Sequence, residues 1–160
     1  MGTVGSASPS ISVSFGMSTI PESVRSVLES SALAHLVTLE PDGSPQVSII
    51  WVGLDGDEIV AGHLAERRKV RNIRENPRVV LSFETNTHNE RGLVEYLVIH
   101  GRARISEGGA PALLQQLAHI YLGPDVQFPP PSAVQPGYIT HITVDRITGV
   151  GPWAGSQSPG

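Results

Sequence analysis

The sequence contains no cysteine, which excludes disulfide bonds, thiolate metal sites and thiol nucleophiles. A chain without cysteine fits a reducing compartment, and we expect a cytoplasmic protein. Charged residues are scarce at 16%, against 39% hydrophobic residues, which is typical of a globular protein. No run of about 18 apolar residues occurs, so no membrane span is expected. The first 16 residues also lack the basic start and continuous apolar stretch of a signal peptide.

Positive charge is scarce overall and is concentrated in one segment. ERRKVRNIRENPR, residues 66–78, holds six of the eleven lysines and arginines and two of the fifteen acidic residues. The segment therefore carries a formal charge of +4, whereas the rest of the chain carries −8. A chain that is acidic outside one short segment is poorly suited to tracking a nucleic-acid backbone. The distribution instead favours binding of one compact anion.

The order of apolar runs and turns predicts a mainly β domain. Asp-Gly turns at 42–43 and 55–56 separate apolar runs, which is the pattern of antiparallel strands joined by short turns. We predict three helices, within the segments 18–31, 66–76 and 110–123, and six strands, over residues 32–40, 44–54, 58–64, 78–85, 93–105 and 138–150. Ser18 or Thr19 is placed to cap the first helix. The elements predict one antiparallel barrel with helices over its ends, spanning residues 18–154, between a flexible leader (1–17) and a flexible tail (155–160).

The basic segment has two sides on a helical wheel. Arg67, Arg71, Arg74 and Arg78 share one face, which we interpret as solvated surface. Val70 and Ile73 point toward the core. The arginine face alone therefore does not predict a binding site.

Lys69 and Asn72 lie away from the arginine face, at the edge of the apolar side. A lysine and an asparagine beside the free N–H groups of a helix start can bind a phosphate. Arg67 or Arg68, in the first turn, could close over the same anion, and the pattern leaves the choice between them open.

Other polar residues in predicted strands are further candidates. Gln46 and Ser48 share one face of their strand, and either face solvent or bind the edge of a planar heterocycle. The six histidines form no ligand pattern, so no metal site is predicted. His63 is singled out because it ends a strand immediately before the basic helix. No catalytic residue can be identified.

These features together resemble a known family. DGSPQVS, a second Asp-Gly turn, and Lys69-x-x-Asn72 followed by Asn76-Pro77-Arg78 resemble the pyridoxamine 5′-phosphate oxidase-like split-barrel family. VIHGRARI and the ending PGYIT…DRITGVGPW are similar to its actinobacterial branch that uses coenzyme F420, a deazaflavin. The resemblance covers residues 18–154. The family's R-x-x-L-L-K motif is absent, which argues against a vitamin B6 oxidase.

The resemblance implies a six-stranded split β-barrel and a homodimer with its cofactor at the subunit interface. It implies that Lys69 and one of Arg67 and Arg68 hold the cofactor phosphate, and that Asn72 supports them. The implied residues around the cofactor ring are Gln46, Ser48, Ile50, Trp51 and the backbone near Ala61 and His63.

The resemblance also implies the activity. Hydride would pass from reduced coenzyme F420 to a small electron-poor acceptor such as an enoate, a quinone or a tetrapyrrole. We expect loops 85–92 and 123–137 to shape the acceptor pocket. Two alternatives stay open: an FMN-dependent oxidoreductase on the same fold, and a cofactor-storage protein without a reaction of its own.

Overall fold

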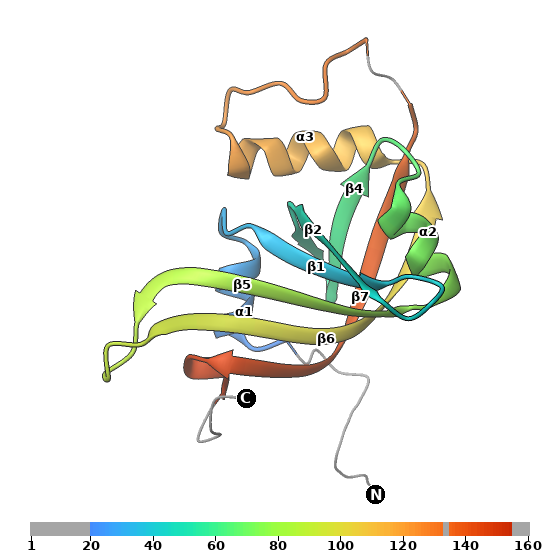
Figure 1. Ribbon diagram of the computed structural model, residues 1–160. Helices are drawn as coiled ribbons and strands as arrows, with labels where there is room; N and C mark the ends of the chain where they lie inside the picture. Colours follow the sequence, from blue (N-terminus) through green and yellow to red (C-terminus); the bar gives the residue numbers. More distant parts are fainter. Residues whose placement is uncertain (1–19, 133–134, 155–160) are drawn as a thin grey trace, which may run out of the picture.

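The computed structural model describes residues 20–132 and 135–154, which form seven antiparallel strands and three α-helices (Figure 1). The predicted leader and tail, with the capping candidates Ser18 and Thr19, lie outside the described residues. Within the described ranges no helix is long and apolar enough to cross a membrane. The elements are α1 (Glu22–Leu28), β1 (Ala34–Leu39), β2 (Pro45–Ile50), β3 (Gly53–Asp55), β4 (Glu58–His63), α2 (Arg68–Glu75), β5 (Arg78–His88), β6 (Val94–Glu107), α3 (Ala110–Tyr121), β7 (Tyr138–Val150) and a short 3₁₀ turn (Pro152–Ala154).

The strands form one sheet that closes toward a barrel. Its order is β2-β1-β5-β6-β7-β4-β3, with every neighbouring pair antiparallel. β2 and β3 therefore lie at opposite edges, although only Trp51 and Val52 separate them in the chain. Because two residues span only about 7 Å, the two edges must approach each other there. The predicted mainly β split-barrel class is confirmed.

The predicted number of strands was six, and the structure has seven. The difference lies in residues 44–54, which were predicted as one strand and form both β2 and β3. The break occurs where the chain leaves one edge of the sheet for the other. Val52 leaves the backbone ladder at this point, and its N–H donates to the Tyr121 hydroxyl at 3.1 Å. The apolar residues continue through the break, so the sequence pattern did not indicate where β2 ends and β3 begins.

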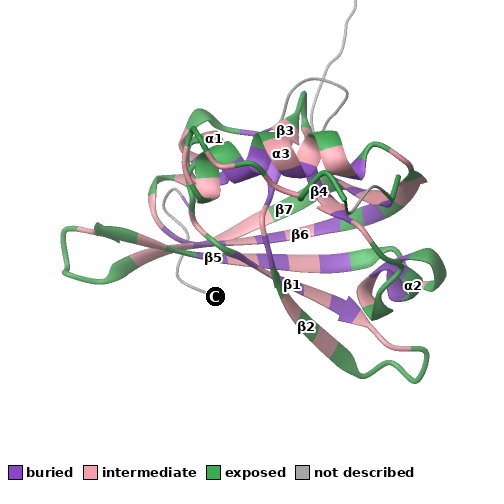
Figure 2. Ribbon diagram, turned by 90° about the horizontal axis from the view of Figure 1, so that it is seen from above, coloured by how far each residue is buried: buried purple, intermediate pink, exposed green. Residues whose placement is uncertain are grey.

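The core lies between α1 and the concave side of the sheet. Its largest fully buried side chains include Leu28 of α1, Leu36 of β1, Phe83 of β5 and Leu97 of β6. Figure 2 shows buried segments along the middle of the central strands and exposed ones on β2 and the β5–β6 hairpin tip. Each such side chain contributes about 2 kcal/mol on burial. The central strands are therefore a rigid frame for the loops at their ends.

Two helices flank the end of the barrel at which β4 terminates (Figure 1). α2 packs against β1 and β6, and α3 packs over β4. Gly137, just before β7, has a φ of +65°, and a Cβ there would lie 2.3 Å from the His63 carbonyl oxygen. Only glycine fits this junction, which holds the start of β7 against the end of β4.

α2 is shorter than predicted, and this changes the arginine face. Arg67 is its N-cap residue, with an extended backbone, and Arg78 opens β5. Only Arg71 and Arg74 of the predicted face lie on the helix. The predicted four-arginine helical face is therefore wrong, because Asn76-Pro77 ends the helix before Arg78 and the helix starts only after Arg67.

Candidate functional site

Two adjoining hollows lie beside α2. The first, called the polar hollow, has a volume of about 440 Å³ and is lined by Gln46, Ser48, Ala65, Glu66, Arg67, Arg68, Lys69 and Arg71. The second, called the apolar hollow, has about 330 Å³ and is lined by Leu33, Ile49, Ile50, Trp51, Gly62, His63, Leu64, Ala65, Arg67, Lys69, Leu114 and Phe128. Ala65, Arg67 and Lys69 line both hollows, so the two hollows adjoin at these three residues.

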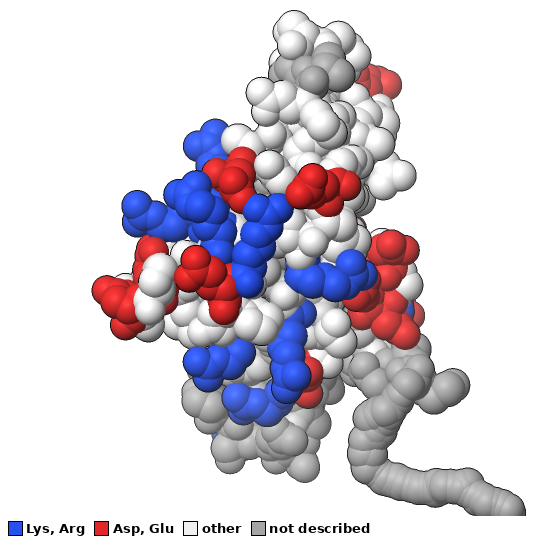
Figure 3. Space-filling model, turned by 90° about the vertical axis from the view of Figure 1, so that its right-hand side faces the viewer, with Lys and Arg blue, Asp and Glu red and all other residues white. Residues whose placement is uncertain are grey.

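The polar hollow gathers positive charge that is only partly neutralised. Figure 3 shows lysine and arginine side chains grouped on the face of the molecule that carries α2. Arg68 is 64% exposed and pairs with Glu40 at 3.4 Å, and Glu66 pairs with Arg74. Among the described residues, Arg67, Lys69 and Arg71 have no acidic partner, although Arg71 donates to the Glu66 carbonyl at 3.0 Å. Arg67 and Lys69 are therefore the cations most available to an anionic ligand.

Lys69 is the more deeply placed of the two. Burial lowers the pKa of its ammonium group, and the neighbouring Arg67 lowers this pKa further. Both effects disfavour the charged form of the lysine. A bound anion would offset the effect of Arg67 on the Lys69 pKa, because a nearby negative charge favours the ammonium ion. The site is thus electrostatically prepared for an anion.

A chain of hydrogen bonds links α2 to the floor of the polar hollow. Asn72 is 4% exposed, and its Nδ2 donates to Thr38 Oγ1 at 3.0 Å. Thr38 donates to Gln46 Oε1 at 3.0 Å, and Gln46 Nε2 donates to Ser48 Oγ at 3.3 Å. Every donor in this chain points outward from the core. The Ser48 hydroxyl is an acceptor in its last bond, so its own hydrogen remains to be donated into the hollow.

The apolar hollow has an aromatic wall. The Trp51 ring stacks on Tyr121 at 5.3 Å between centroids, with 12° between the planes, and meets the Phe128 ring edge-on at 5.5 Å. Trp51 and Phe128 line the hollow, and Tyr121 lies behind them. The Tyr121 hydroxyl donates to the Ala32 carbonyl at 3.0 Å. Trp51 is thus held from behind by a tyrosine that is itself fixed to the backbone.

His63 closes the inner end of the apolar hollow. It is 6% exposed, and its Nε2 lies 2.7 Å from Thr140 Oγ1. Burial, and to a lesser extent the charge of Lys69, lowers the pKa of His63 to about 4. The imidazole is therefore uncharged at neutral pH. It contributes shape and a hydrogen bond to Thr140, and no charge.

Eight of the ten predicted site residues line the two hollows: Gln46, Ser48, Ile50, Trp51, His63, Arg67, Arg68 and Lys69. The other two lie behind the walls. Ala61 is 1% exposed in β4, and Asn72 is reached only through Thr38. Sequence reasoning did not find Thr38, Tyr121 or Phe128. Thr38 and Tyr121 lie in an apolar strand and on the apolar face of a helix, so the sequence pattern marked both as core residues.

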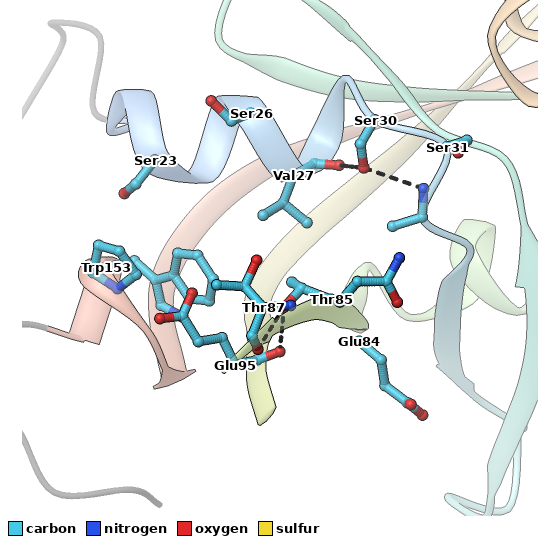
Figure 4. Close-up of a pocket in the computed structure, with 13 residues that line it drawn as sticks. Ser23, Ser26, Val27, Ser30, Ser31, Glu84, Thr85, Thr87, Glu95 and Trp153 are labelled. Carbon is cyan, nitrogen blue, oxygen red and sulfur yellow. Dashed lines mark hydrogen bonds between the residues drawn. The ribbon is translucent and has the colours of Figure 1, made fainter. Parts of the chain in front are cut away.

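A third cavity lies elsewhere and has the opposite character. This serine groove, of about 510 Å³, runs between α1 and the β5–β6 hairpin and includes Ser23, Ser26, Glu84, Glu95 and Trp153 (Figure 4). Its lining residues include two carboxylates and no lysine or arginine. A phosphate would be repelled there. The polar hollow is therefore the better phosphate site.

Comparison with known proteins places this geometry in a family. The model of the pyridoxamine 5′-phosphate oxidase family matches residues 20–150, nearly all of the described chain. The chain belongs to the pyridoxamine 5′-phosphate oxidase family. This confirms the predicted family and supports a general flavin- or deazaflavin-dependent oxidoreductase. A search of curated protein sequences finds no match.

Solved structures give a finer comparison. An F420 reductase is 30% identical, with a TM-score of 0.65, over 81% of this chain and 98% of the other. A conserved hypothetical protein from Mycobacterium tuberculosis is 23% identical over 82% and 84% of the two chains, with a TM-score of 0.63. An FAD-binding protein from Mesorhizobium loti is 19% identical over 78% and 88%, with a TM-score of 0.55. The last two show the shared fold alone.

Proposed function

We propose that the protein is an oxidoreductase that transfers hydride from reduced coenzyme F420 to a small electron-poor organic acceptor. The observation that carries the proposal is that the two hollows adjoin: a cationic hollow suited to a phosphate lies next to an apolar hollow with an aromatic wall, and three residues line both. The 30% identity to an F420 reductase, over nearly its whole length, favours coenzyme F420 over FMN.

Lys69 and Arg67 hold the phosphate in this proposal. Both side chains line both hollows, and neither is engaged by an acidic residue in the described part of the chain. The start of α2 lies between them, and no side chain caps its first turn within the described ranges. Uncapped N–H groups at a helix start bind anions. Arg68 is the weaker candidate, because Glu40 already pairs with it.

The ring of the cofactor is placed along β2 and Trp51. Ile50 and Trp51 supply apolar contacts from the apolar hollow. Ser48, which lines the adjoining polar hollow, donates its hydroxyl hydrogen to an oxygen or nitrogen at the ring edge. When bound, the reduced deazaflavin would supply a hydride, which carries two electrons and one proton, and the acceptor would take up one further proton from another source. Trp51, Leu114 and Phe128 exclude water from the acceptor side. His63, uncharged at neutral pH, is not the source of that proton.

We also propose that a second copy of the chain covers the site. Val47 and Ile49 are 59% and 61% exposed on the outer face of β2, and Leu33 is 48% exposed beside them. Ile49 and Leu33 belong to the wall of the apolar hollow. A homodimer that buried this face would complete the wall. Light scattering should show a dimer, and Val47→Asp together with Ile49→Asp should give monomers that bind the cofactor more weakly.

Titration with coenzyme F420 and, separately, with FMN tests the cofactor. We expect fluorescence changes that saturate at micromolar coenzyme F420 and little change with FMN. Micromolar FMN binding without coenzyme F420 binding would favour the FMN-dependent alternative. Single-turnover oxidation of the bound reduced cofactor, with a panel of enoates and quinones, then tests the reaction. A storage protein would show no rate that depends on the acceptor.

A further inference from the structure

The loop after α3 is held in place by one glutamine side chain. Gln115, in the middle of α3, donates from Nε2 to the Val126 carbonyl at 2.9 Å. Its Oε1 accepts from the Phe128 N–H at 3.1 Å. One amide therefore pairs with the backbone on both sides of Gln127, as a neighbouring strand would. The loop backbone at this point is therefore bound to α3 by both the nitrogen and the oxygen of one side-chain amide.

This attachment decides where the Phe128 ring stands. The ring meets Trp51 edge-on at 5.5 Å, and both rings line the apolar hollow. Gln115 does not line the hollow and reaches it only through Phe128. Figure 1 shows the loop rising from the end of α3 and returning over it toward β7. Phe128 is thus carried on a loop whose position over the hollow depends on Gln115.

The other walls of the apolar hollow come from regular structure and from the short connections beside it, which contribute Leu33, Leu64 and Ala65. Ile50 ends β2, Gly62 and His63 end β4, and Leu114 lies on α3. Trp51 is stacked on Tyr121, whose hydroxyl is fixed to the backbone of Ala32. Phe128 packs edge-on against Trp51 of this fixed pair, and it is the wall residue that the long loop after α3 contributes. The position of this loop therefore decides how much of the apolar hollow the Phe128 ring fills.

We propose that Gln115 is a positioning residue that holds Phe128 against Trp51, and that the Gln115–Phe128 attachment limits the size of the acceptor. The size limit rests on the proposed function, whereas the attachment itself does not. Loss of the amide frees the backbone N–H of Phe128 and lets the ring withdraw. The hollow then accepts bulkier molecules, and it holds compact ones less firmly.

Gln115→Ala, Phe128→Ala and Gln115→Glu test the proposal, with Gln116→Ala as the matched control. Gln116 is the next residue of the same helix and is exposed, and its side chain has no hydrogen bond to any described residue. Gln115→Glu keeps the acceptor for the Phe128 N–H and removes the donor to Val126. It should therefore behave between wild type and Gln115→Ala.

The first readout needs neither cofactor nor acceptor. In a Trp153→Phe background Trp51 is the sole tryptophan, and its emission reports on the packing of Phe128. Gln115→Ala should increase acrylamide quenching of Trp51 about as much as Phe128→Ala does. Gln116→Ala should leave it unchanged. Equal quenching in the Gln115 and Gln116 variants would overturn the proposed attachment.

The second readout is acceptor selectivity. The ratio of kcat/KM for a bulky quinone to that for a compact one should rise by about fivefold or more in Gln115→Ala, on the scale expected for a changed apolar pocket. The Kd for coenzyme F420 should stay within about twofold, since the phosphate residues are untouched. An unchanged ratio beside increased quenching would overturn the size limit alone. Failure of wild type to bind coenzyme F420 would instead refute the proposed function, and the size limit with it, while the quenching result would stand.

Discussion

The two hollows differ in the buried polar pair that lies behind each of them. Behind the polar hollow, Asn72 and Thr38 pass their hydrogen bonds outward through Gln46 to Ser48. Behind the apolar hollow, His63 bonds to Thr140, and no further side-chain bond leads outward among the described residues. The first pair delivers a hydrogen-bond donor to a ligand. In the second pair, burial and the charge of Lys69 keep the His63 imidazole neutral at neutral pH. The first buried pair thus supports ligand binding, whereas the second adds a hydrogen bond but no charge.

The largest expected effect concerns His63 and the free energy of unfolding at low pH. The pKa of His63 is lowered from 6.5 to about 4, so between these values the unfolded chain binds a proton that the folded chain does not. The free energy of unfolding should therefore fall by up to about 3 kcal/mol as pH drops from 6.5 to 4, and this contribution should stay constant above 6.5. Urea denaturation across this range should show a shallower fall in His63→Gln, which still bonds to Thr140. Equal slopes in both proteins would contradict the neutral buried imidazole.

Removal of Asn72 should break the outward chain. Asn72→Ala leaves Thr38, which is fully buried, without its donor, and should lower the free energy of unfolding by about 2 kcal/mol at neutral pH. Unlike the His63 effect, this loss should not depend on pH between 4 and 6.5. Denaturant titration measures it, and Asn86→Ala, at an exposed position of β5, is a control of the same residue type. A loss below about 0.5 kcal/mol would show that the chain contributes little.

Lys69→Ala tests the charged side of the contrast in binding. Hydrogen bonds to charged groups contribute about 1.5 kcal/mol or more, so the Kd for coenzyme F420 should rise by about tenfold or more. Arg91→Ala removes the same charge at the tip of the β5–β6 hairpin, which Figure 1 shows at the opposite end of the sheet from α2, and should change the Kd little. Arg74→Ala should also matter less than Lys69→Ala. Equal losses in the Lys69 and Arg91 variants would indicate only general attraction of an anion.

The smallest expected effect separates the two adjacent arginines. Arg67→Ala should weaken binding of coenzyme F420 by about 1 kcal/mol, because Arg67 faces both hollows without an acidic partner. Arg68→Ala should weaken it by a few tenths, since Arg68 is exposed and paired with Glu40. Isothermal titration at low and moderate salt distinguishes them. The reverse order would move the phosphate to the outer side of α2.

Sequence patterns predicted the barrel class and the neighbourhood of the site for identifiable reasons. The Asp-Gly turns and alternating apolar runs predicted most strands, and the concentration of charge at 66–78 indicated the segment that lines the polar hollow. The patterns could not show that Trp51 lies between two strands, because its neighbours are apolar on both sides of the break. They also could not bring Phe128 to the hollow. That contact depends on Gln115, thirteen residues away, and a proline-rich loop has no periodicity from which to predict it.

The passage of the chain through Trp51 and Val52 has a dynamic consequence. The edge strands β2 and β3 meet there without backbone hydrogen bonds between them. Local opening of the barrel should therefore need the least free energy along this seam. A ligand bound between β2 and β4 contacts both sides of the seam and stabilises its closed form. Occupancy should then slow amide hydrogen exchange in Pro45–Ile50 and Gly53–Asp55, far beyond the few residues that the ligand touches. Ligand binding would thus be detectable as reduced local opening of the two edge strands.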